Sequence, residues 1–163
     1  MERGVAQLLE VLGGWAGFDV AEVTTERAPA PDAVGLPSPR IVIRLAPKPD
    51  HPKTCSRCGS PVVAVHDTSE RRVRDLPLGE WDTWLIVPRA RVECPRCGPV
   101  VEALPWLDKH ARMTTRLAEK IAALAQQLPI KQVAQWFGVH WSTVKVIDQR
   151  AMARRLGRME DHL

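Results

Sequence analysis

The sequence lacks the segments that would carry a chain into or across a membrane. No apolar run reaches ~18 residues, the length a transmembrane helix needs. The first six residues contain no basic stretch followed by an apolar core, so no secretory signal is predicted. We therefore expect a cytoplasmic protein without a membrane partner, in which thiols stay reduced.

Cysteine is scarce, and all of it lies in two pairs. The chain has four cysteines, in Cys-Ser-Arg-Cys-Gly and Cys-Pro-Arg-Cys-Gly hooks separated by 35 residues. Two such hooks supply the four thiolates that tetrahedral Zn²⁺ requires. Gly59 and Gly98 follow the hooks and let the backbone turn tightly, so that its amides face the sulfurs. We predict one structural Zn²⁺ bound by Cys55, Cys58, Cys94 and Cys97.

Other uses of these cysteines fit the pattern less well. Two disulfides would need an oxidising compartment, and a redox site would be a single pair at a helix start. A catalytic zinc keeps an open position, which a shell of four cysteines closes. His51 and His66 lie near enough to replace a ligand, but we expect both to be surface histidines because four sulfurs already complete the shell.

The first two thirds of the chain alternate in the manner of strands. A helix is expected over residues 3–15 and a loop over the proline-rich residues 28–39. Turns are expected at 67–69 and 77–79, and Pro88 indicates an edge or a bulge. Strands are expected over residues 18–25, 41–46, 62–66, 70–75 and 81–92.

From Thr114 the apolar period changes to that of a helix. Thr114 or Thr115 can cap a helix with an apolar face, which Pro129 ends. That face consists of Leu117, Ile121, Leu124 and Leu128. A second helix is expected over residues 130–137, and a third from about 140–142 to beyond 148.

Residues 130–150 meet the requirements of a helix-turn-helix. Ala134 is small where two helices would cross, and Gly138 tolerates the backbone of a tight turn. Apolar residues occupy the positions that close a small core, namely Val133, Phe137, Val139, Val144 and Ile147. An ordinary helical hairpin remains the alternative.

The predicted fold class is α+β, with a small β-rich four-cysteine zinc ribbon followed by a helical helix-turn-helix domain. We divide the chain into residues 1–39 (helix, strand and loop), 40–104 (zinc ribbon, which needs its metal to fold) and 105–163 (helix-turn-helix). Net charge is +4; residues 1–39 hold 2 basic and 6 acidic side chains, and residues 105–163 hold 10 and 5. Positive charge at the C-terminal end suits a polyanionic partner, although a solvated helix face would look similar.

We expect that partner to be double-stranded DNA. Ser, Thr and Gln can bond base edges or phosphates, whereas Lys and Arg neutralise phosphates and make binding depend on salt. Trp141 could contact a thymine methyl group or brace the turn, and Trp136 is assigned to the core or to a subunit contact. The predicted DNA-binding residues are His140, Trp141, Ser142, Thr143, Lys145 and Gln149, together with Lys131, Arg71, Arg72 and Arg74.

The order of these parts resembles the N-terminal region of the ISL-three family of bacterial insertion-sequence transposases. The resemblance rests on the ribbon, the Arg-Met-Thr-Thr-Arg-Leu link at 112–117, the helix-turn-helix, and the Glu-Arg-Arg-Val-Arg-Asp-Leu-Pro run at 70–77. It implies binding to the terminal inverted repeats of a mobile element. Such transposases cut and join DNA with an Asp-Asp-Glu, two-metal domain.

The sequence departs from that family by ending at Leu163, about where the catalytic domain would begin. We therefore expect a bacterial, nucleoid-associated DNA-binding chain without catalysis of its own, either a fragment or a short relative. One alternative is a transcription regulator or repressor derived from such a transposase. Another is a zinc-stapled protein-interaction or dimerisation module. A homodimer, or association with full-length transposase subunits, is expected as a further partnership.

Overall fold

The computed structural model describes residues 2–27 and 39–160, and these form two compact units. The first contains the described residues up to Thr115, and the second contains residues 116–160. A β-sheet dominates the first unit and helices make up the second, which confirms the α+β class. No helix among the described residues is both long and apolar enough to span a bilayer.

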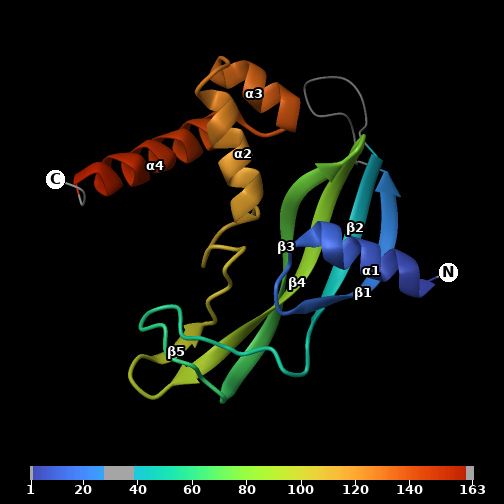
Figure 1. Ribbon diagram of the computed structural model, residues 1–163, viewed down its shortest axis with the longest axis vertical. Coiled ribbons are helices and arrows are strands. Elements are labelled where there is room, and N and C mark those ends of the chain that lie inside the picture. Colours follow the sequence, from blue (N-terminus) through green and yellow to red (C-terminus); the bar gives the residue numbers. More distant parts are fainter. Residues whose placement is uncertain (1, 28–38, 161–163) are drawn as a thin grey trace. The chain divides into compact units, whose positions relative to one another are not determined.

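One mixed sheet organises the first unit (Figure 1). After helix α1 (Glu2–Gly13), the chain forms β1 (Phe18–Arg27), β2 (Pro39–Pro47), β3 (Val65–Leu78), β4 (Trp81–Cys94) and β5 (Gly98–Val101). The strand order is β1-β2-β4-β3, with β5 also pairing with β4. Among the five described strands, β2 pairs with β4 in parallel and the other pairings are antiparallel. Because β1 pairs with β2, residues 18–27 share a sheet with the ribbon region, and the division of the chain at residues 39 and 104 stays a prediction.

Alternation along the central strands produces one apolar face. Ile43, Leu85 and Val73 lie on β2, β4 and β3 and are fully buried. Period-two alternation places every second side chain of a strand on the same side of the sheet. The cluster built on this face also contains Trp15, Phe18, Leu45, Val87, Leu104, Trp106 and Leu107.

The turn expected at residues 67–69 is wrong, because β3 runs without a break from Val65 to Leu78. Asp67 pairs with Arg91 of β4, and Ser69 pairs with Arg89. Asp, Thr and Ser favour turns locally, but pairing along a long neighbouring strand overrides that preference.

Pro88 lies inside β4 at a point where one side of the strand lacks a ladder partner. β2 pairs with β4 as far as Ile86, and β5 pairs with it from Arg91. Between those positions β4 is locally an edge on that side, while Glu70 of β3 lies opposite Pro88 on the other. A residue without an N–H is tolerated there, as expected for an edge position.

The second unit holds α2 (Thr115–Ala125), α3 (Ile130–Phe137) and α4 (Trp141–Glu160). The bounds of α3 agree with the sequence-based expectation. α2 is shorter than expected, because Leu128 lies beyond its end and is exposed. The buried side chains from the three helices are Leu117, Ile121, Ala122, Val133, Ala134, Phe137 and Val144.

Candidate zinc centre and nucleic-acid interface

The four cysteine sulfurs form one cluster. All four Sγ atoms lie within 4.8 Å of one another, and those of Cys58 and Cys94 are 3.6 Å apart. A tetrahedral zinc site with Zn–S bonds of ~2.3 Å has sulfur–sulfur edges of about 3.8 Å, whereas a disulfide bond is about 2.05 Å long. The cysteines are therefore free thiols whose spacing fits one structural Zn²⁺.

Each hook turns through a glycine in the left-handed region. In the first hook the Gly59 N–H donates to the Cys55 carbonyl oxygen at 2.9 Å, and the Cys55 N–H donates to the Ser60 carbonyl oxygen at 2.9 Å. In the second, Cys94 at the end of β4 pairs with Gly98 at the start of β5. Both glycines have φ 70°, where a side chain would be strained, so the tight turn predicted at these two residues is confirmed. In the first hook a backbone amide also faces a sulfur, because the Arg57 N–H donates to the Cys55 Sγ at 3.4 Å.

Without a bound cation, the thiols of this cluster have pKa values that are shifted in opposite directions. Hydrogen bonds from the side chain and backbone of Ser60 lower the pKa of Cys58 to about 6. Burial and the neighbouring cysteine sulfurs raise the pKa of Cys97 to about 12. Bound Zn²⁺ stabilises the thiolate form of all its ligands, and this donor set matches such a dication.

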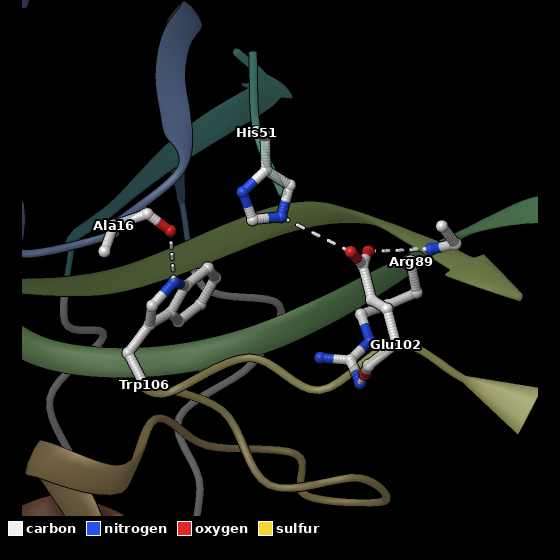
Figure 2. Close-up of polar contacts among 6 residues, drawn as sticks. Ala16, His51, Arg89, Glu102 and Trp106 are labelled. Carbon is white, nitrogen blue, oxygen red and sulfur yellow. Dashed lines mark hydrogen bonds and ion pairs between the residues drawn. The ribbon is translucent and has the colours of Figure 1, made fainter. Parts of the chain in front are cut away.

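A buried carboxylate, that of Glu102, lies beside His51 and Arg89 (Figure 2). Glu102 is 2% exposed; its Oε1 accepts a hydrogen bond from the Ala90 N–H at 3.0 Å, and its backbone bridges to Cys55. Its Oε2 lies 3.4 Å from His51 Nε2, and its carbonyl oxygen accepts a bond from Arg89 Nη2 at 3.0 Å. Burial lowers the pKa of that arginine. These contacts join the segment before the first hook to β4.

The expectation of a surface position is wrong for His51 and correct for His66. The His51 side chain is 7% exposed, and its ring centroid lies 5.1 Å from that of Phe18. A nearby carboxylate and an aromatic neighbour make burial of this imidazole acceptable. His66 is half-exposed and pairs with Glu93 at 3.5 Å.

The turn between α3 and α4 has the geometry that its sequence predicted. Ala134 is buried, and Gly138 ends α3 with φ 57° and ψ 42°, the left-handed conformation. The Val139 N–H donates to the Ala134 carbonyl oxygen at 3.0 Å. This bond satisfies a carbonyl group at the C-terminal end of α3 directly after Gly138. Helix α4 starts at Trp141, three residues after that glycine.

His140 caps the start of α4. Its Nδ1 accepts a bond from the Ser142 N–H at 3.3 Å and lies 2.7 Å from the Ser142 Oγ. The His140 carbonyl oxygen accepts from the Thr143 N–H at 3.0 Å, as the first helical bond. The His140 and Trp141 rings are 5.6 Å apart. Three of the predicted DNA-binding residues therefore have fixed positions in the first turn of the helix.

One side of α4 is open to solvent. Lys145 and Gln149 are exposed, Trp141 is 49% exposed, and Ser142 and Thr143 are half-buried. Val146 also lies on α4 and is 44% exposed, but it was not among the candidate residues predicted from the sequence. Its place four residues after Ser142 and three before Gln149 is the signal that could have identified it.

Helix α3 carries one predicted DNA-binding residue, Lys131, and Trp136, which was assigned to the core or to a subunit contact. Lys131 is exposed near the start of that helix. Trp136 is 80% exposed, so assignment of this side chain to the core is wrong and the subunit-contact alternative stays a prediction. Its neighbours Val133, Ala134 and Phe137 take the buried positions of this short helix instead.

Two of the three predicted ribbon arginines, Arg72 and Arg74, have partners within the sheet, whereas Arg71 on β3 is exposed without an ion pair among the described residues. Arg72 Nη2 lies 2.6 Å from Glu26 Oε2, and Arg74 Nη2 lies 3.0 Å from Asp82 Oδ1. Both guanidinium groups lie over the Trp84 ring, at 5.2 and 5.9 Å from its centroid. The hydrogen bond from Arg72 lowers the pKa of Glu26. The guanidinium groups of these two predicted DNA contacts therefore already have carboxylate partners in the first unit.

Comparison with known proteins finds a match for the region of the cysteine cluster and another for the region of the helical unit. Residues 51–97 match the family described as the zinc-finger of transposase IS204/IS1001/IS1096/IS1165, and residues 102–152 match the helix-turn-helix domain of transposase family ISL3. The chain is 40% identical over 144 residues to the transposase for insertion sequence element IS1001 of Bordetella parapertussis. It is 31% identical over 116 residues to the transposase for IS1557 of Mycobacterium tuberculosis.

The matches cover most of this chain and a minor part of each relative. They span 88% and 70% of this chain, but 33% of the IS1001 transposase and 26% of the IS1557 transposase. No solved structure matches the chain significantly. With its four-cysteine cluster and its three-helix unit, the chain carries the N-terminal zinc-ribbon and helix-turn-helix regions of the ISL3 transposase family.

Proposed function

We propose that this chain binds double-stranded DNA sequence-specifically, and that its target is the terminal inverted repeat of an insertion sequence. The observation that carries this proposal is the division of α4 between two environments. Val144 is fully buried in the helical core, whereas Lys145 and Gln149 are exposed beside it. A helix held from one side can enter a major groove, which is about 12 Å wide, with the other.

The first turn of α4 carries the groups suited to base readout. Ser142, held by His140, and Gln149 two turns later offer hydrogen-bond donors and acceptors for base edges. Val146 presents methyl groups between them, which suits a thymine methyl group. Sequence discrimination is therefore assigned to this side of the helix.

Cations at the borders of the same unit would bind phosphates. Lys131 lies on α3, and exposed arginines continue along α4 beyond Gln149, namely Arg150, Arg154, Arg155 and Arg158. Phosphate contacts set affinity and orientation without reading sequence. Loss of one such cation should weaken binding to all duplexes alike.

In this proposal the chain contributes recognition of DNA, and strand cutting and joining are not assigned to it. The chain spans about a third of the IS1001 transposase, and the zinc-finger and helix-turn-helix matches account for residues 51–97 and 102–152. The exposed Trp136 supports a contact with a second subunit, which pairing of two element ends would require.

The proposal is tested by selecting bound sequences from a random duplex pool and measuring affinity for the selected duplex. Gln149→Ala should lower affinity for the selected duplex about tenfold or more and leave random duplexes unaffected. Lys131→Gln should weaken both by the same factor. Selection that yields no shared sequence, or equal loss on both duplexes with Gln149→Ala, would contradict sequence-specific readout by α4.

A further inference from the structure

Each cysteine hook carries an arginine directly before its second cysteine. Arg57 precedes Cys58 and Arg96 precedes Cys97. Both arginines are exposed. Within the part of the chain that the structure describes, neither guanidinium has an ion pair.

Several arginines on the sheet differ from these two. Arg44 pairs with Glu70 and Glu22, and Arg91 pairs with Asp67 at 4.0 Å. Arg72 and Arg74 are paired as described above, and Arg89 is buried. Arg71 on β3 is an exception, because it is exposed and has no such pair among the described residues. A polyanion would therefore meet open cations on the hooks, whereas most guanidinium groups along the central strands already have a carboxylate partner or are buried.

The metal cluster brings the two hook arginines to the same end of the unit. The sulfurs of Cys58 and Cys97 lie within 4.8 Å of each other, and consecutive Cα atoms are about 3.8 Å apart. The hook backbones are held by turns at Gly59 and Gly98. Two cations fixed on one rigid tip lose less freedom on binding than cations on separate loops.

We propose that Arg57 and Arg96 form a phosphate-binding pair on the zinc centre, and that its ligand is the sugar–phosphate backbone of duplex DNA. This inference deepens the proposed function and rests on it. The guanidinium group suits phosphate oxygens because it offers two parallel N–H donors. Zinc thereby contributes to DNA affinity by holding the pair together, in addition to holding the fold. Contacts of this kind read no sequence.

The test uses the full zinc-loaded chain with Arg57→Gln and Arg96→Gln combined, and measures affinity for the selected duplex and for a random duplex across a salt series. Each lost phosphate contact reduces the slope of log K against log salt by about 0.9, so the variant should lose about 1.8. The fall in affinity between about 50 and about 200 mM salt should then be about tenfold smaller than in wild type. The loss should be the same on both duplexes.

A matched control removes the same charge from paired positions. Arg44→Gln with Arg72→Gln should change the slope by less than half as much, because those guanidinium groups already have carboxylate partners. Arg57→Lys with Arg96→Lys should restore most of the slope, since lysine also binds phosphate. Zinc content must remain one ion per chain in every variant, which separates loss of contact from loss of the metal site.

The outcomes separate this inference from the proposed function. A wild-type chain that binds no duplex overturns both. Salt-dependent wild-type binding with an unchanged slope in the Arg57 and Arg96 variant overturns the hook pair alone. An equal change in the Arg44 and Arg72 control would attribute the effect to net charge, and would also overturn it.

Discussion

The Thr114 hydroxyl donates a hydrogen bond to the buried Asp75 carboxylate at 2.6 Å, across 39 positions of the sequence. The same carboxylate accepts bonds from the Trp15 indole N–H and the Leu76 N–H, each at 2.8 Å. The backbone of Arg74 also exchanges hydrogen bonds with the segment before α2. Asp75 thus joins β3, the segment after α1 and Thr114 within the first unit.

Asp75→Ala should lower the free energy of unfolding by about 3 kcal/mol or more, because it leaves buried donors on Trp15 and Thr114 without their acceptor. Urea unfolding followed by tryptophan fluorescence measures the change. Asp67→Ala is the control, since its pair with Arg91 is exposed and should contribute less than about 1 kcal/mol. Equal losses in the two variants would contradict the role given to Asp75.

Two glycines of the helical unit should respond in opposite directions to alanine. Gly138 has φ 57°, so Gly138→Ala should destabilise the unit by about 1–2 kcal/mol. Gly157 lies inside α4, where an added Cβ meets nothing within 4 Å, and Gly157→Ala should stabilise it by about 0.5–1 kcal/mol. Thermal unfolding followed by helical circular dichroism tests both. Stabilisation by Gly138→Ala would contradict the left-handed turn between α3 and α4.

Removal of zinc should unfold the region around the hooks. Cys55, Cys94 and the buried Val92 and Val100 belong to one small cluster, which is too small to be stable without the metal. Amide hydrogen exchange with and without a chelator measures this, and the amide of Val92 should lose its protection. Cys55→Ser should have the same effect at ordinary zinc concentrations. Protection at Val92 that survives chelation would contradict a structural role for the metal.

The cysteine cluster and the turn between α3 and α4 could be predicted because each depends on a short sequence pattern. The cysteine spacing fixed the ligand set, and the 3.6-residue period with Gly138 fixed the bounds of α3 and the start of α4. The sheet was predicted less well, because its contacts lie far apart in sequence. Pairing with β4 overrides the turn residues at 67–69.

Side-chain partners were the least predictable part of the site. Arg72 was expected to face DNA because the run around it is basic, but its partner Glu26 comes from β1. His51 was expected on the surface, and Glu102, 51 positions later, accompanies it into the interior. Such pairs depend on which strands become neighbours, and the spacing of charges along the chain does not reveal that. For the same reason the sequence does not show that Arg57 and Arg96 lack a carboxylate partner among the described residues, whereas Arg44, Arg74 and Arg91 have one.

Val146 should read a thymine methyl group in the selected duplex. Replacing each thymine in turn by deoxyuridine removes one methyl group, and at one position this should cost wild type about fourfold in affinity. Val146→Ala should abolish that cost and leave the other thymines unaffected. Met152→Ala, a change at a similarly exposed residue further along α4, serves as control. If deoxyuridine at that position still lowers the affinity of the Val146→Ala variant, the result would contradict this contact.

The most direct test of sequence-specific recognition by α4 is the ratio of the chain's affinity for the selected duplex to its affinity for a shuffled duplex of equal length, measured at physiological salt. A helix that reads bases should give a ratio of about 10³ or more. Gln149→Ala should reduce that ratio without changing the affinity for the shuffled duplex. A ratio near one in the wild-type chain would contradict sequence-specific recognition by α4.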